Sequence, residues 1–284
     1  MELKLLELGP RRLALELGGV SAAQSNAIRR ALLADVPKLA IDDVEFHLGP
    51  IRDESTGKDY DSSTSMFDEA VALRLGLLPI PTDLGQFRRR SECSCKGEGC
   101  AHCQVMYSID KKGPCTVYAR DLVPLGDAEL AILEPEVPIV RLGARQALLA
   151  YATAVVGNAR DHAKWQVVHA VSIQPRATVK IHKKSGCSAA CLKRLAEAAP
   201  EGLLEFANDR LSYTGGDDAS RPLLLLGTQK LCEHGSLEVV VDDADHLVTF
   251  ETDGSLSPRD ALRYALKNLK GRFEELREAV QAIP

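Results

Sequence analysis

The C-terminal end of the chain carries the longest regular apolar pattern in the sequence. Its apolar residues recur every three or four positions for about six turns of an α-helix. Ser257 is placed to cap this helix, Pro258 suits its first helical position, and Asp260 adds a negative charge to its first turn. Such a stripe packs either on its own domain or on another chain, and the pattern by itself favours its own domain. The stripe consists of Leu262, Ala265, Leu266, Leu269, Phe273, Leu276 and Val280.

A second helix is predicted near the N-terminus, behind a capping-box pattern formed by Ser21 and Gln24. Its apolar face contains Ala27, Ile28, Ala31 and Leu32. The opposite face contains Asn26, Arg29, Arg30 and Leu33. For an isolated helix, the two arginines indicate a solvated surface.

The rest of the chain alternates between short strand patterns and turn signals. Gly9-Pro10 separates two strands of a hairpin, and the sequence from 92 to 175 favours strands and turns. Further expected elements are a strand over 39–46, helices over 67–75 and 189–199, and a hairpin of 237–241 with 246–251. No internal repeat is evident.

The composition excludes several classes of protein. The 284 residues carry a net charge of −5, which argues against a general nucleic-acid binder with a basic face. No apolar run reaches the roughly 18 residues of a membrane helix, and the first residues do not form a signal peptide. We therefore expect a cytoplasmic protein, in which eight cysteines point to metal binding before disulfides.

Four of these cysteines lie within eleven residues, at Cys93, Cys95, Cys100 and Cys103. The two glycines between the pairs allow a tight reversal of the backbone. Four thiolates on a small loop suit one tetrahedral, structural Zn²⁺ ion, with His102 as a less suitable substitute ligand. The alternatives are reduced thiols without metal or, in a thermophile, disulfides.

The remaining cysteines form a weaker pattern. Cys187 and Cys191 are separated by three residues, and Cys232 lies far downstream. A disulfide or a three-ligand metal site is a minority interpretation for this group. Cys115 is expected to be a small buried residue.

Other patterns give little support to catalysis. Asp161 and His162 lack a second catalytic motif, so we expect a packed strand segment there, with Trp165 as an interface anchor. The basic clusters 88–90 and 180–184 are more typical of solvated faces than of phosphate contacts. No phosphate-binding loop, dinucleotide fingerprint or catalytic triad is present.

Several ordered stretches resemble the assembly-platform family of cellular RNA polymerases, which comprises the bacterial alpha subunit, its archaeal counterpart and the third-largest eukaryotic subunit. The archaeal members are the most similar, and the resemblance covers nearly the whole chain. The stretches are Asn26-Ala-Ile-Arg-Arg-Ala-Leu-Leu33, Ala40-Ile-Asp-Asp-Val-Glu-Phe46, Ser63-Thr-Ser-Met-Phe-Asp-Glu69, Arg74-Leu-Gly-Leu-Leu-Pro-Ile80 and Arg160-Asp-His-Ala-Lys-Trp165.

The resemblance implies an α+β fold and a non-catalytic subunit of DNA-dependent RNA polymerase. Residues 1–46 and 236–284 would form a discontinuous dimerisation domain that pairs with subunit L. Residues 47–178 and 223–235 would form an inserted, mostly-β domain with the zinc loop, and residues 179–222 a ferredoxin-like insertion.

The resemblance also implies the partners and contacts. Subunit L would cover the C-terminal stripe at Leu262, Leu266, Leu269, Phe273 and Leu276. Asn26, Arg29 and Arg30 would contact the large catalytic subunits, and the small subunits N and P would belong to the same assembly. DNA contact would be indirect at most.

Some archaeal relatives carry an iron–sulfur cluster in the ferredoxin-like insertion, and many members hold zinc near the first cysteine group. Here the stretch 198–206 resembles a ferredoxin segment, but Ala199 stands where the cysteine would be. A cluster needs four closely spaced thiolates, so we expect a degenerate module without iron. The alternative functions are a stand-alone zinc-binding nucleic-acid module and an iron–sulfur redox protein.

Overall fold

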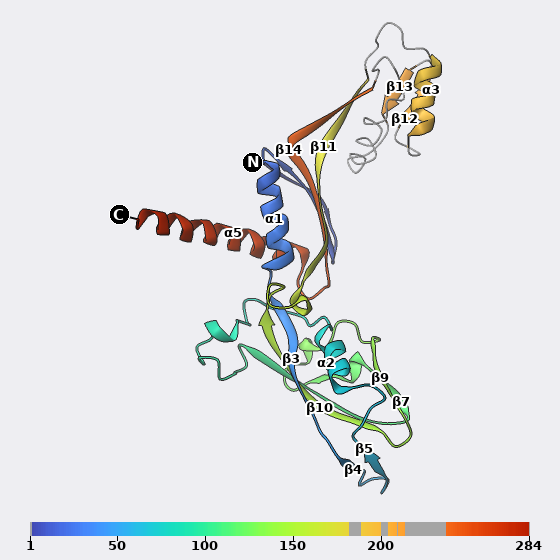
Figure 1. Ribbon diagram of the computed structural model, residues 1–284, viewed down its shortest axis with the longest axis vertical. Coiled ribbons are helices and arrows are strands. Elements are labelled where there is room, and N and C mark those ends of the chain that lie inside the picture. Colours follow the sequence, from blue (N-terminus) through green and yellow to red (C-terminus); the bar gives the residue numbers. More distant parts are fainter. Residues whose placement is uncertain (1, 182–188, 200–203, 209, 214–236, 284) are drawn as a thin grey trace. The chain divides into compact units, whose positions relative to one another are not determined.

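The computed structural model describes residues 2–181, 189–199, 204–208, 210–213 and 237–283. Its helices and sheets confirm the predicted mixture of both element types (Figure 1). The described residues belong to two units. The first unit lies within Met1–Leu8, Arg12–Arg29 and Ala170–Phe250, and the second within Gly9–Arg11, Arg30–His169 and Glu251–Pro284.

A four-stranded sheet is the centre of the first unit, in the order β1-β2-β14-β11. Its strands are β1 (Glu2–Leu8), β2 (Arg12–Gly18), β14 (Leu237–Thr252) and β11 (Val168–Ile181). β1 and β2 pair antiparallel, with Leu5 opposite Leu15, and confirm the hairpin predicted around Gly9-Pro10. Leu13 and Leu17 of β2 are buried, whereas every residue of β1 is exposed.

Helix α1 (Ala22–Ala34) begins at the predicted capping box. The backbone N–H of Ser21 donates to Gln24 Oε1 at 2.8 Å, and the N–H of Gln24 donates to Ser21 Oγ at 3.3 Å. The predicted apolar face is confirmed, since Ile28 and Leu32 are buried. The first turn of α1 is therefore fixed by the side chains that the sequence places there.

The hairpin expected within 237–251 is wrong, because the structure has one continuous strand, β14, over that range. The residues expected to turn are paired instead. The carbonyl of Ala244 accepts from the N–H of Val20 at 2.9 Å, and Asp245 Oδ1 accepts from the N–H of Gly19 at 3.2 Å. Aspartates favour turns only where the backbone has no better partner.

The second unit is built on another four-stranded sheet, in the order β3-β10-β6-β8. These strands are β3 (Lys38–Phe46), β10 (Ala147–Gly157), β6 (Gln104–Lys112) and β8 (Val123–Pro124). Helix α2 (Asp68–Gly76) packs on β3 and contributes Val71 and Leu75 to the core. Tyr107 is fully buried there, and its hydroxyl donates to the carbonyl of Leu130 at 2.8 Å.

Strand β3 belongs to the sheet of the second unit. β3 pairs along its length with β10, from Lys38 opposite Gly157 to Phe46 opposite Ala150. Its Leu39 and Ile41 are buried in the core of the second unit. Apolar alternation predicts the strand but does not specify the sheet that it joins.

Smaller elements complete the described chain. The two-stranded pairs are β4 (Pro50–Arg52) with β5 (Asp59–Asp61), β7 (Cys115–Tyr118) with β9 (Pro138–Leu142), and β12 (Leu204–Ala207) with β13 (Arg210–Tyr213). α3 (Ala189–Ala198) confirms the helix predicted there. The short 3₁₀ helices are η1 (Arg90–Glu92), η2 (Ala119–Asp121), η3 (Ala128–Leu130) and η4 (Ala163–Trp165).

Helix α5 (Pro258–Gln281) confirms the predicted C-terminal helix. Ser257 Oγ accepts from the N–H of Asp260 at 3.1 Å, as the capping pattern indicates. The fully buried residues of α5 are Pro258, Ala261 and Ala265, all in its first third. No helix in the described part of the chain is long and apolar enough to cross a membrane.

A buried ion pair holds the start of β3 to the segment between β14 and α5. Lys38 Nζ lies 2.5 Å from Asp253 Oδ2, and the two side chains are 3% and 19% exposed. We expect Lys38→Met to lower the free energy of unfolding by about 3 kcal/mol, because it leaves a largely buried carboxylate without its cation. Denaturant titration measures this loss. The exposed Lys58→Met serves as the control, and an equally small effect of both changes would contradict the assignment.

Candidate functional site

Four cysteine thiols form the clearest candidate site, on the loop between η1 and β6. The sulfur atoms of Cys93, Cys95, Cys100 and Cys103 all lie within 4.8 Å of one another. The closest separations are 3.5 Å for Cys93 with Cys100 and 3.6 Å for Cys95 with Cys103. The structure therefore brings together all four residues that the spacing singles out.

These separations suit a tetrahedral metal ion. Four sulfurs at about 2.3 Å from a zinc ion lie about 3.8 Å apart, close to the observed distances. Gly97 and Gly99 have φ values of +91° and +97°, which confirms the permissive backbone expected between the pairs. A Cβ atom at Gly99 would meet only the movable end of the Gln104 side chain, so the positive φ, rather than a lack of space, is what requires glycine there.

The pKa values of the thiols differ along the loop, because their burial and hydrogen-bond donors differ. The backbone N–H groups of Gly99 and Gly97 lower the pKa of Cys95 to about 6. Burial raises the pKa of Cys103 to about 12. The loop thus offers hydrogen-bond donors to a thiolate at Cys95 and a buried environment at Cys103.

The loop is tied to its surroundings by polar contacts. Arg90 Nη2 donates to Gln104 Oε1 at 2.8 Å, and the N–H of Arg88 donates to the carbonyl of His102 at 2.9 Å. His102 does not belong to the four-thiol group, so the structure gives no support to its role as substitute ligand. Cys115 is half-buried, and its thiol donates to the carbonyl of Lys112 at 3.4 Å.

The second cysteine group is described only in part. Cys191 is buried on α3 and is disulfide-bonded. Cys187 and Cys232 lie outside the described residues, as does much of the ferredoxin-like stretch 198–206.

The polar face of α1 is exposed as predicted at Asn26 and Arg30. Asn26 Oδ1 accepts from Arg29 Nε at 3.0 Å and from Arg29 Nη2 at 2.8 Å. The guanidinium group of Arg29 is therefore held by a residue of the same helix, Asn26. These contacts keep the fork of Arg29 in one orientation, which suits recognition of a carboxylate or carbonyl group.

Apolar side chains are exposed along α5 from Leu266 onward. The exposed fractions are 39% for Leu266, 63% for Phe273, 57% for Leu276 and 57% for Val280. Leu262 and Leu269 are half-buried. No described segment of the chain covers this stripe. The pattern by itself favours packing of the helix on its own domain, and the structure differs from that expectation.

Apolar side chains are also exposed on strand β1 and on the segment around α2. Strand β1 exposes Leu3, Leu5, Leu6 and Leu8, and the α2 segment exposes Phe67, Leu73 and Leu77. Phe67 is the most exposed of them, at 85%. In β1, leucines alternate with charged residues. This pattern predicts a strand with its leucines buried on one face, so it does not reveal that they are exposed. Groups of this kind mark interaction surfaces.

The strand expected around residues 160–165 is wrong, and so is the interface role of Trp165. The segment forms a turn followed by η4. Trp165 is buried, and its Nε1 donates to the carbonyl of Val155 at 3.0 Å. Lys164 Nζ lies 4.3 Å from the centre of the ring and 2.6 Å from Asp42 Oδ1. The tryptophan therefore stabilises the second unit from inside.

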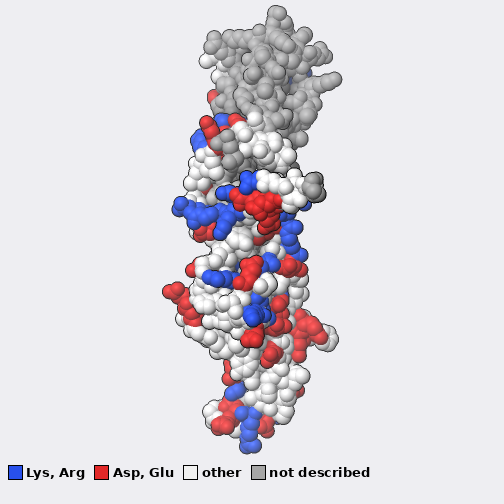
Figure 2. Space-filling view, turned by 90° about the vertical axis from the view of Figure 1, so that its left-hand side faces the viewer, with Lys and Arg blue, Asp and Glu red and all other residues white. Residues whose placement is uncertain are grey.

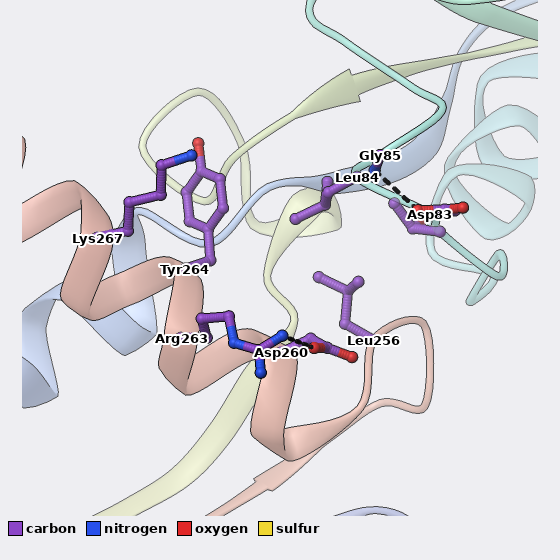
Figure 3. A pocket seen from close by; sticks show the side chains of 9 residues that line it. Asp83, Leu84, Gly85, Leu256, Asp260, Arg263, Tyr264 and Lys267 are labelled. Carbon is purple, nitrogen blue, oxygen red and sulfur yellow. Dashed lines mark hydrogen bonds and ion pairs between the residues drawn. The ribbon is translucent and has the colours of Figure 1, made fainter.

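A pocket of about 510 Å³ lies beside the first turns of α5 (Figure 3). Leu84 and Leu256 line it opposite Tyr264 and Lys267. Its acidic groups are engaged locally, because Asp260 accepts from Ser257 and Arg263, and Asp83 accepts from the N–H of Gly85. The pocket holds no pairing of nucleophile and base among the described residues that line it, so its lining supports no catalytic role.

Comparison with known proteins gives a consistent result. The family model described as "RNA polymerase Rpb3/Rpb11 dimerisation domain" matches residues 14–273. DNA-directed RNA polymerase subunit Rpo3 of Picrophilus torridus is 41% identical over 278 residues, with 98% of this chain and 99% of that protein covered. The Rpo3 subunits of Thermoplasma volcanium and Methanosarcina acetivorans are 40% and 33% identical, with 97% or more of each chain covered.

The cysteine loop generates a direct prediction of metal content. We expect the purified chain to hold about one metal ion, and Cys103→Ser to lose most of it, because a closed four-thiolate site tolerates no missing ligand. Elemental analysis of the protein measures this. Cys115→Ser, outside the group, should keep the metal. Metal retained by Cys103→Ser, or absent from the unchanged chain, would contradict the assignment.

Proposed function

We infer the function of this chain from its family: it belongs to the RNA polymerase Rpb3/Rpb11 dimerisation-domain family, and it serves as an assembly subunit of DNA-directed RNA polymerase. The observation that carries this inference is the match of nearly the whole chain to Rpo3 subunits. The subunit is non-catalytic, and nucleotide transfer belongs to the complex.

The partner at the dimerisation surface is proposed to be subunit L. The apolar stripe of α5 supports this proposal, because its members are spaced 4, 3, 4, 3 and 4 residues apart from Leu262 to Val280. This is the seam of a helix that packs lengthwise on another helix. The proposed contacts are Leu262, Leu266, Leu269, Phe273 and Leu276.

The proposed domain organisation is discontinuous. Terminal segments near 1–46 and 236–284 would form the dimerisation part, and residues 47–178 the inserted part with the cysteine loop. The stretch 223–235, also assigned to the inserted part from the sequence, lies outside the described residues. The pairing of β3 with β10 favours an earlier boundary, before Lys38. Within 179–222, α3 and the β12–β13 hairpin are compatible with a degenerate ferredoxin-like module.

Further contacts are proposed for the polar face of α1. Asn26, Arg29 and Arg30 would face one of the large catalytic subunits, and the small subunits N and P would join the same assembly. The exposed α2 segment around Phe67 offers a second apolar docking surface. A cytoplasmic location follows from a role in transcription.

The metal is proposed to be one structural Zn²⁺ ion held by Cys93, Cys95, Cys100 and Cys103. Four sulfurs leave no open position for substrate, so the ion would fix the loop and take no part in chemistry. An iron–sulfur cluster is not proposed, because Ala199 replaces the expected cysteine.

The alternative functions gain no support. On the face shown in Figure 2, acidic and basic side chains of the described residues are interspersed and form no continuous basic surface. Together with the net charge of −5, this argues against a stand-alone nucleic-acid-binding module.

Changing the stripe tests the dimerisation surface. Phe273→Ser with Leu276→Ser should weaken the heterodimer with subunit L on the order of 100-fold, because it removes two apolar anchors from the contact. Co-purification and sedimentation measure the affinity. Glu274→Ser with Glu278→Ser, on the opposite side of α5, should leave the affinity unchanged. Equal effects of the two pairs would refute this surface.

Reconstitution of the core polymerase tests the proposed contact of Arg29 and Arg30 with a large catalytic subunit. Arg29→Ala with Arg30→Ala should leave the heterodimer intact but reduce the yield of reconstituted core polymerase about tenfold, because both guanidinium contacts are lost. Lys193→Ala with Arg194→Ala removes the same charge from α3 and should assemble normally. Unchanged reconstitution by the α1 variant would exclude the proposed contact.

A further inference from the structure

A buried carboxylate, Asp35, lies at the end of α1 and receives two arginines from distant parts of the chain. Arg160 Nε lies 2.6 Å from Asp35 Oδ1, and Arg272 Nη1 lies 3.3 Å from Asp35 Oδ2. The side chain of Asp35 is 4% exposed, whereas those of the two arginines are 53% and 56% exposed. Each carboxylate oxygen therefore has its own cationic partner.

Two of these three residues are held independently of α5. The N–H of Asp35 donates to the carbonyl of Ala31 at 2.9 Å, and the N–H of Arg160 donates to Asn158 Oδ1 at 3.1 Å. The contact with Asp35 also raises the pKa of Arg160, so this pair stays charged. Asp35 and Arg160 thus form a fixed anchor, and Arg272 is the member that α5 brings to it.

The position of Arg272 along α5 gives the contact its importance. The buried residues Ala261 and Ala265 hold the start of the helix, and Arg272 follows on the same side, about 10 Å beyond Ala265. Every described residue of the helix after Arg272 is exposed. Within the described chain, Arg272 is the last residue of α5 to form an ion pair with a residue outside the helix.

A helix held only at its beginning can pivot, whereas a second attachment further along fixes its direction. The part of the helix beyond Arg272 extends about 14 Å to Gln281, so a small rotation at the base would displace the apolar stripe considerably. Figure 1 shows this end of α5 extending away from the sheet that contains β3 and β10.

We propose that the Arg272–Asp35 ion pair is a positioning contact that fixes the direction of the second half of α5 and so presents Phe273 and Leu276 to the partner subunit. This inference rests on the proposed dimerisation function. Preorganisation of a helix before binding raises affinity because less conformational freedom is lost on association.

Because Asp35 has two arginine partners, a positioning role of Arg272 can be distinguished experimentally from a contribution to stability alone. An exposed ion pair contributes little, but Asp35 is buried and must keep at least one cation. Arg160→Ala and Arg272→Ala each remove one partner and leave the other. Both should lower stability to a similar, modest extent, but only Arg272→Ala frees the helix.

The experiment compares these variants in the full chain, free and with subunit L. Arg272→Ala should weaken the heterodimer about tenfold, Arg160→Ala less than about twofold, and Arg272→Lys should recover part of the loss. In the free chain, amide exchange over 273–281 should be faster in Arg272→Ala than in Arg160→Ala. Similar affinities and similar exchange in the two alanine variants would overturn the proposal.

The outcome also distinguishes this proposal from the proposed function. If the unchanged chain failed to bind subunit L, the dimerisation role would be wrong, and the amide-exchange comparison would still test the contact. If the unchanged chain bound and Arg272→Ala bound equally well, the positioning role alone would be wrong.

Discussion

The short corner between α1 and β3 carries the two buried charges on which the arrangement of the second unit depends. Asp35 binds Arg160 and Arg272, and Lys38 binds Asp253. Neither Asp35 nor Lys38 can be hydrated where it lies, so each requires a partner of opposite charge. As a result, the turn after β10, the segment between β14 and α5, and the middle of α5 all meet at one four-residue stretch of chain.

The sequence predicts those features that depend on neighbouring residues. The capping box at Ser21, the cap at Ser257 and the hairpin at Gly9-Pro10 all appear in the structure. The four-thiol group also forms as expected, because all its members lie on one loop between Cys93 and Cys103. In each case a short range of residues determines the conformation, and no distant segment competes with it.

The errors arise where distant segments decide the outcome. Residues 242–245 have turn composition, yet pairing with the chain at Val20 keeps β14 extended. Trp165 was expected at an interface, but it is buried in a cluster with Ala40, which lies 125 positions earlier in the chain, and Val155. The contact of Arg272 with Asp35 joins residues 237 positions apart, and no local sequence pattern predicts it. Such contacts depend on tertiary packing, which a single sequence does not specify.

The exposed leucines of β1 make the chain prone to aggregation when it is not bound to a partner. Among the described strands β1 lies at the edge of its sheet, where its exposed Leu3, Leu5 and Leu8 leave apolar surface beside backbone groups that no described strand pairs. Unprotected edges of this kind recruit other strands and lead to aggregation. We therefore expect a copy that lacks its partners to aggregate more readily than the assembled subunit, so the amount of this chain that stays in solution depends on how much of its partners is present.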